Sequence, residues 1–409
     1  MIIYIDKTIA EHGDFTYQEE NMFTELACAH KRGDCFLCGH TLSIDRLKKD
    51  ISAYRWGVDS NHSELGALFG EVETVVIITY GEKPNLPKSV ERIIKAQNEQ
   101  QDGEEQQTKY VRVVSVEQAI NYRLGDQCIF LCESTNDCAL YKLFAERYMY
   151  SIRDRIRGVS LSLKDENGGG QTTFQQLEKC VRTEHHLTVC VTDSDKKHGV
   201  SEQFVNKPGL GQTASALLAA QNTLESEGLD TLFDLLVLDV HEIENLLPLS
   251  VLDDVAQNGV QDARRGIDYL RLLQVKKEEL NRNAREQNDK DKEKYPEVML
   301  CYDVKKGVNI QTLKNDLQNP KKKKKVSKAL LAYWEEVAEI VGDDSIPGVA
   351  EKILTHAMRR MEEVTASGYK KVVDYPLDEY LIDHWETIGK KVFSWGIANK
   401  PMPTAPFSR

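Results

Sequence analysis

Short apolar, β-branched runs alternate with segments of helical periodicity over the first 250 residues. The alternation is clearest in the middle of the chain, in the runs QCIFLCE, GVSLSL, LTVCVTD and LFDLLVLDV. We expect the second of these strands to end at the polar stretch KDENGGG. Short buried strands that alternate with helices indicate a parallel sheet with right-handed crossovers. The pattern therefore predicts an α/β fold, with a parallel sheet flanked by helices.

The same pattern divides the chain into three predicted domains. A chain of 409 residues is too long for one ordinary core. Residues 1–125 alternate strands and helices and are expected to form an N-terminal α/β domain of unknown role. Residues 126–250 hold the four runs above and are expected to form the catalytic domain. Residues 251–409 are charged and mainly helical, and they include one extended element, VMLCYDVKKGVNI.

Composition restricts the classes of function. The net charge of −12 argues against a protein that coats nucleic acid, but it permits a nuclease whose acidic site is neutralised by metal. The nine cysteines lie mostly in apolar runs, which is typical of reduced thiols in a cytosol. No apolar run approaches the roughly 20 residues of a membrane-spanning helix, and the N-terminus lacks the features of a secretory signal. We expect a cytoplasmic protein that does not bind membranes.

Acidic residues follow three of the four apolar runs. They are Glu133 and Asp137, then Asp193 and Asp195, then Glu242 and Glu244. The carboxyl ends of parallel strands are where open α/β sheets place their binding sites. Carboxylates crowded at one sheet edge repel each other unless a cation binds between them. Oxygen ligands suit Mg²⁺ or Mn²⁺, so the acids predict a metal-dependent phosphoryl-transfer site.

The order of these acids, a Glu and then a DxD in a βαβαβαβ pattern, resembles the TOPRIM domain. The local detail resembles the OLD-like nuclease branch. The motifs that carry this resemblance are the ExxxD spacing of Glu133 and Asp137, the turn Gly168–Gly170, HEIENLLP at 241–248 and DVKKG at 303–307. The resemblance covers roughly residues 126–250 and the 301–307 segment, and it does not extend to the first 125 residues.

The resemblance implies a nuclease dependent on Mg²⁺ or Mn²⁺ that cleaves DNA or an RNA such as tRNA. By analogy, Glu133, Asp193 and Asp195 would hold one metal. Asp137, with Glu242 or Glu244, would complete or bridge a second. Lys305 would stabilise charge on the phosphorane oxygens. Spacing alone does not decide between Glu242 and Glu244, or between Lys305 and Lys306.

The same resemblance implies a role in antiphage defence, because OLD-like nucleases often act beside an ABC-type ATPase. This chain has no GxxxxGK[ST] loop. The expected partners are therefore a nucleic acid substrate and a separate ATPase subunit, and a homodimer is left open.

Two other classes of function are alternatives. One is a phosphatase-type phosphotransferase with Asp193 as nucleophile and Asp195 as acid, which leaves Glu133 unexplained. The other is a catalytically silent TOPRIM-like regulatory module.

Further candidate groups also have a structural interpretation. A structural zinc would use Cys35 and Cys38 with His40 or Cys28, although CFLCGH is also typical of a buried strand and turn. Two interpretations are open for Lys196 and Lys197 and for the five lysines 321–325. They either contact a phosphate or are solvated residues at the surface.

Overall fold

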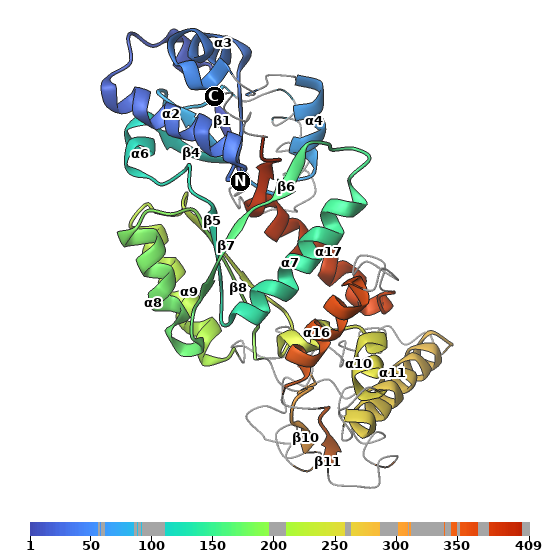
Figure 1. Cartoon of the computed structure of the whole chain (residues 1–409). Helices are drawn as coiled ribbons and strands as arrows, with labels where there is room; N and C mark the ends of the chain where they lie inside the picture. Colours follow the sequence, from blue (N-terminus) through green and yellow to red (C-terminus); the bar gives the residue numbers. More distant parts are fainter. Residues whose placement is uncertain are drawn as a thin grey trace, which may run out of the picture. The chain divides into compact units, whose positions relative to one another are not determined.

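The computed structural model describes residues 1–55, 58, 62–85, 88, 91, 111–195, 210–257, 263–286, 302–309, 311, 339, 345–349, 352–366 and 376–402. The chain forms two compact units. The first comprises Met1–Val191, Ala216–Leu236 and Glu386–Arg409, and the second comprises Thr192–Ser215 and Val237–Trp385. The elements are labelled in Figure 1, and each unit is described by itself.

The first unit begins with a four-stranded parallel sheet in the order β2-β1-β3-β4. The strands are β1 Ile2–Ile5, β2 Phe36–Gly39, β3 Val75–Thr79 and β4 Val111–Ser115. Strands β1 and β3 are buried along their whole length, which explains their continuous apolar runs. The helices that connect or follow the strands are α1 Thr8–Glu11, α2 Tyr17–Arg32, α3 Thr41–Asp50, η1 Ser52–Arg55, α4 His62–Gly70 and α6 Val116–Asn121.

A second four-stranded sheet has the order β7-β5-β8-β9. Its strands are β5 Cys128–Cys132, β7 Leu163–Asn167, β8 Thr188–Thr192 and β9 Phe233–Val237. Strand β5 pairs in parallel with both β7 and β8. Helix α7 (Thr135–Ser151) and helix α8 (Thr173–Glu178, continued by η3 Lys179–Thr183) lie on opposite sides of this sheet in Figure 1. The α/β class with parallel sheets flanked by helices is confirmed.

The predicted end of the second strand is wrong. Strand β6 (Val159–Leu161) pairs antiparallel with β12 (Ile397–Asn399), and the polar stretch that was expected to end the strand instead forms β7 beside β5. Its acids have partners, since Lys142 Nζ lies 2.5 Å from Asp165 and Gln176 donates to Glu166. Strand β7 is at the edge of the sheet, where charged residues are tolerated and discourage pairing with other chains.

The second unit is mainly helical. Its elements are η5 Ile243–Leu246, α10 Leu249–Gln257, α11 Ala263–Glu286, α16 Ile353–Ala366 and the short antiparallel pair of β10 Gly307–Asn309 with β11 Ser345–Pro347. Helix α10 packs against α11 and α16. Helices α9 (Gln212–Ser226) and α17 (Glu379–Gly396) contribute residues to both units. Much of the chain between 86 and 110, in the predicted N-terminal domain, and between 312 and 344, in the predicted helical region, lies outside the described residues.

Within the described residues, no helix is both long enough and apolar enough to span a membrane.

A buried arginine connects the two sheets of the first unit. Arg112 on β4 donates from Nε to Thr74 Oγ1 at 3.0 Å and from a terminal nitrogen to the carbonyl of Phe233 at 2.7 Å, and it also donates to the carbonyl of Asp230. Its guanidinium lies 3.6 Å from the carboxylate of Asp234 and covers the ring of Trp395. One side chain thus satisfies the start of β9 and, together with Lys391 at 2.9 Å, compensates the charge of Asp234.

We predict that Arg112→Met lowers the free energy of unfolding by about 3 kcal/mol, because it leaves buried acceptors without a donor. Urea denaturation measures this change. Arg123→Met is the matched control, since the pair of Arg123 with Asp126 is exposed at 3.8 Å, and its loss is expected to cost less than about 1 kcal/mol. Equal effects in the two variants would contradict a structural role for the buried guanidinium.

Candidate functional site

The segment DVKKG forms a tight turn in the second unit. Asp303 Oδ1 accepts from the amide of Lys306 at 2.7 Å, and the Asp303 carbonyl accepts from the amide of Gly307 at 2.7 Å. Gly307 has φ +79°, and a Cβ there would overlap the carbonyl of Ile346. The motif is therefore explained locally, since Asp closes the turn and only Gly fits its end.

This turn directs Lys305 at two buried carboxylates. Lys305 Nζ lies 3.1 Å from Glu244 Oε1 and 3.8 Å from Glu242 Oε1. The Glu244 side chain is 4% exposed and that of Glu242 is 13% exposed. The neighbouring Lys306 is exposed. The geometry thus places Lys305, and both glutamates of HEIEN, in one cluster.

Burial and charge shift the pKa values in this cluster. Burial raises the pKa of Glu242 above its usual value, although Lys305 offsets part of the effect. Burial alone would lower the pKa of Lys305, but Glu244 and Glu242 outweigh it, and the lysine pKa is raised. Lys305 is therefore held as a cation beside the two glutamates.

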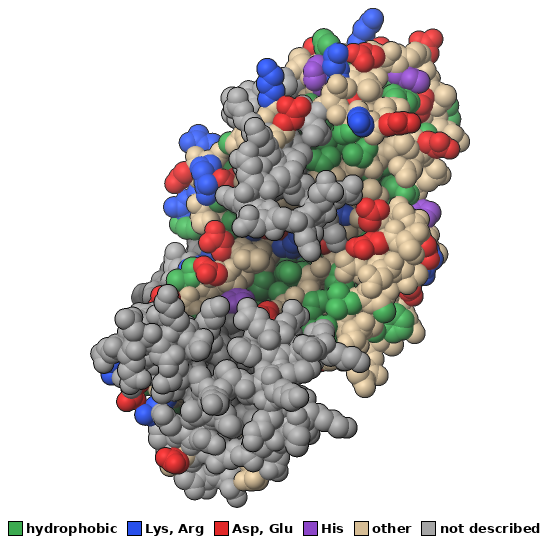
Figure 2. Space-filling view, turned by 180° about the vertical axis from the view of Figure 1, so that it is seen from behind, with side chains coloured by type: hydrophobic (Ala, Val, Ile, Leu, Met, Phe, Trp, Pro, Cys, Tyr) green, Lys and Arg blue, Asp and Glu red, His purple; other side chains and the backbone are tan. Residues whose placement is uncertain are grey.

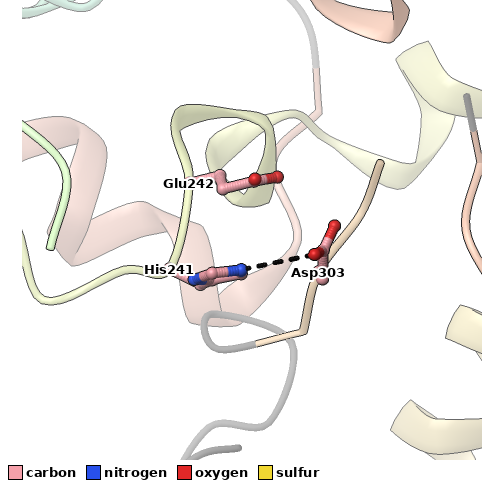
Figure 3. Close-up of side chains that lie close together, drawn as sticks. All are labelled: His241, Glu242 and Asp303. Carbon is pink, nitrogen blue, oxygen red and sulfur yellow. Dashed lines mark ion pairs between the residues drawn. The ribbon is translucent and has the colours of Figure 1, made fainter. Parts of the chain in front are cut away.

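His241 and Asp303 lie beside Glu242 (Figure 3). His241 Nε2 is 3.7 Å from Asp303 Oδ2. Burial would raise the pKa of Asp303, but the facing imidazole and the Lys306 amide hold that pKa below its usual value. One donor atom from each of His241, Glu242 and Asp303 lies within 4.8 Å of the others. Within the described residues, no other group of three or more His, Cys, Asp or Glu side chains has donor atoms close enough together to share one ion.

Asn245 joins the two segments that carry these groups. Its Oδ1 accepts from the amide of Glu242 at 2.9 Å, and its Nδ2 donates to the carbonyl of Tyr302 at 2.7 Å. Asn245 is buried. It therefore caps the turn at η5 and fixes the position of Glu242 relative to Asp303.

The DxD motif lies directly after β8 and belongs to the second unit. Asp193 Oδ2 accepts from the amide of Ile243 at 3.3 Å, so it contacts the start of η5. Its negative charge also contributes to the raised pKa of Lys305. Asp195 has φ +51°, and a Cβ on Gly211 would overlap its carboxylate. Asp193 thus belongs with the HEIEN glutamates and Lys305, whereas Asp195 faces Gly211.

Glu133 and Asp137 lie in the first unit. Glu133 follows β5, its carbonyl accepts from the amide of Gly169 at 3.1 Å, and its carboxylate would be 3.9 Å from a Cβ on Gly170. Both oxygens of Asp137 accept from Ser134, at 2.9 and 2.8 Å, in the capping box of α7. The capping role explains Asp137 locally.

The remaining candidates are the predicted zinc ligands and the two groups of lysines. Cys35 and Cys38 are buried in or beside β2, and burial raises the pKa of the Cys35 thiol to about 12. They do not gather with Cys28 and His40 into an ion-binding group within the described residues. Lys196, Lys197 and the lysines 321–325 lie outside the described residues.

Charge at the surface is mixed. On the face drawn in Figure 2, acidic and basic side chains of the described residues are interspersed. Any contact of this face with a polyanion would therefore rest on local groups of cations.

His241 and Asp303 are the two members of the cluster that sequence reasoning missed as possible ligands. Their signal was available, because each stands inside a motif already singled out, HEIEN and DVKKG. What the sequence lacked was the fold of the turn, which brings the two motifs together.

Comparison with protein-family models, with curated proteins and with solved structures finds no significant match.

We predict that Asn245→Ala loosens both ligand-bearing segments at once. The amide of Glu242 and the carbonyl of Tyr302 each lose a buried partner, which should lower the free energy of unfolding by about 2 kcal/mol. Hydrogen–deuterium exchange should rise together in residues 241–247 and 302–309. Asn121→Ala removes an exposed bond to the Glu117 carbonyl and serves as the control. Unchanged exchange in either segment would contradict the role of Asn245 in holding both segments.

The raised pKa of Glu242 predicts a pH dependence of stability in chelator-treated protein. Because the folded pKa lies above the unfolded one, this group's contribution is complete below the unfolded pKa and is lost as pH rises through the folded value. Glu242→Gln should therefore gain stability relative to the unsubstituted protein as pH increases from 4 to 8. Thermal melts over this range measure the difference, and a constant difference between the two proteins would contradict the shift.

Proposed function

We propose that this protein is a metal-dependent nuclease that cleaves phosphodiester bonds in DNA or RNA. The observation that carries the proposal is the cluster in the second unit, where the Lys305 ammonium faces the buried carboxylates of Glu242 and Glu244 beside Asp193. Carboxylate oxygens gathered in one partly buried cluster are ligands that a divalent ion can bind.

Glu133 and Asp193 follow neighbouring strands of one sheet. Strands β5 and β8 are parallel neighbours, so the chain leaves both strands at the same edge of the sheet. Glu133 is the first residue after β5, and Asp193 is the first after β8. Side chains that follow adjacent parallel strands are the usual source of sites in α/β folds. Within the second unit, Asp193 and Asp195 would hold one ion, and Glu242 and Glu244 would contribute to a second. Glu133 and Asp137 enter the proposal through the resemblance alone.

The residues present fit such ions because their donors are oxygens, which Mg²⁺ and Mn²⁺ prefer. When bound, divalent ions lower the pKa of a water and neutralise the attacking and leaving oxygens of an in-line displacement. Lys305 is positioned to offset charge that develops on the non-bridging phosphate oxygens. Its raised pKa keeps the side chain cationic at neutral pH, as this role requires.

The resemblance to OLD-like nucleases extends the proposal to antiphage defence under the control of a separate ABC-type ATPase. The chain lacks a phosphate-binding GxxxxGK[ST] loop. In this scheme the protein is the effector, and the partner supplies the nucleotide-dependent step.

The test is cleavage of mixed DNA and total RNA by the purified protein with Mg²⁺ or Mn²⁺, alone and with a candidate ATPase partner. Lys305→Met should lower the cleavage rate by about 10²- to 10³-fold, as expected for loss of a group that stabilises developing charge. Glu133→Gln and Asp193→Asn should abolish cleavage. Lys306→Met is the matched control, because the Lys306 side chain is exposed and adjacent in sequence.

A second assay separates the alternatives. Hydrolysis of a small phosphomonoester that is lost in Asp193→Asn but kept in Glu133→Gln would replace the nuclease with a phosphatase. Calorimetric Mn²⁺ binding without turnover on any substrate, even with the partner present, would favour a silent regulatory module.

A further inference from the structure

We propose that His241, Glu242 and Asp303 form a mixed nitrogen and oxygen site that binds a first-row transition ion and favours Mn²⁺ over Mg²⁺. The inference deepens the proposed function, since this site would be the second of its two ion positions. It adds an imidazole ligand to what the sequence presents as a set of carboxylates.

The spacing of the donors suits a shared ion better than a direct contact. His241 Nε2 and Asp303 Oδ2 are 3.7 Å apart, which is longer than a hydrogen bond. Two ligands at about 2.1 Å from one octahedral ion are about 3.0 Å apart when adjacent and about 4.2 Å apart when opposite. The observed separation falls between these values, and Figure 3 shows the imidazole directed at the Asp303 carboxylate.

Burial gives the second argument. The His241 side chain is only 4% exposed; its Nε2 faces Asp303, and its other nitrogen, Nδ1, has no hydrogen-bond partner within the described residues. Glu242 Oε2 is likewise buried without a partner there. Buried polar atoms are nearly always satisfied, and an ion is one of the groups that account for an exception. His241 and Glu242 come from one segment of the chain and Asp303 from another, so the three donors converge from two segments.

The site is also rigid before an ion binds. Asn245 ties the amide of Glu242 to the carbonyl of Tyr302, the residue before Asp303. The carboxylate of Asp303 is fixed by the Lys306 amide through Oδ1, which leaves Oδ2 toward His241. Such outer contacts orient ligands and raise ion affinity.

The choice of ion follows from the donor types. Mg²⁺ retains water and takes few protein ligands, almost always oxygen. An imidazole nitrogen favours transition ions, among which Mn²⁺ also accepts carboxylates readily. Lys305 lies closer to Glu244 than to Glu242, by 3.1 against 3.8 Å, so it can keep its nearer partner while Glu242 binds the ion.

The test is Mn²⁺ electron paramagnetic resonance on the full chain in a large excess of Mg²⁺. We expect one tightly bound Mn²⁺ per chain whose pulsed spectrum shows coupling to a directly bound imidazole ¹⁴N. His241→Gln should abolish that coupling and weaken Mn²⁺ binding by about 100-fold. Asp303→Asn should weaken binding but keep the coupling. His384→Gln, at a half-buried histidine elsewhere in the second unit, should change neither.

Absence of nitrogen coupling in the unsubstituted protein, or coupling that persists in His241→Gln, would overturn the inference. The Asp303→Asn variant and the unsubstituted spectrum decide the matter if His241→Gln fails to fold. The test distinguishes failure of the metal site from failure of the proposed nuclease activity. Cleavage with Mg²⁺ alone and no nitrogen coupling would leave the nuclease without this site, whereas coupling without cleavage would leave a metal site without the nuclease.

Discussion

The second unit depends on the compensation of buried negative charge around Lys305. Glu242 and Glu244 are largely withdrawn from water, and one ammonium faces both of them. Removing carboxylates from water costs several kcal/mol per group unless partners replace the solvent. Lys305 supplies part of this compensation, and a divalent ion held by His241, Glu242 and Asp303 would supply more of it. The turn at 303–307 and the two hydrogen bonds of Asn245 hold Lys305, Asp303 and Glu242 in these positions.

The sequence predicted the fold class well because the signals were local. Strands β1, β3, β5 and β8 are continuous buried runs. Strand β7 was missed because its charged residues, Asp165 and Glu166 among them, resemble a loop. Their partners Lys142 and Gln176 come from elements that a local pattern does not connect to them.

The sequence predicted most of the individual residues of the candidate site, but not how the fold brings them together. HEIEN and DVKKG each suggested chemistry, but spacing along the chain did not show that Lys305 rather than Lys306 faces the glutamates. That choice depends on the hydrogen bonds of Asp303 to the amides of Lys306 and Gly307. Asp137 illustrates the opposite case, because a local capping box accounts for both of its oxygens. The assignments of the metal ligands, the substrate and the ATPase partner stay predictions.

The central claim is that the cluster around Lys305 is built to hold a divalent ion, and anomalous X-ray diffraction from crystals grown with Mn²⁺ tests it most directly. We expect an anomalous peak within bonding distance of Glu242 and Asp303, with Lys305 still paired to Glu244. A fully occupied Mn²⁺ elsewhere in the crystal, with no peak at this cluster and Lys305 still between the two glutamates, would contradict it. The buried acids would then be a structural ion pair and not a metal centre.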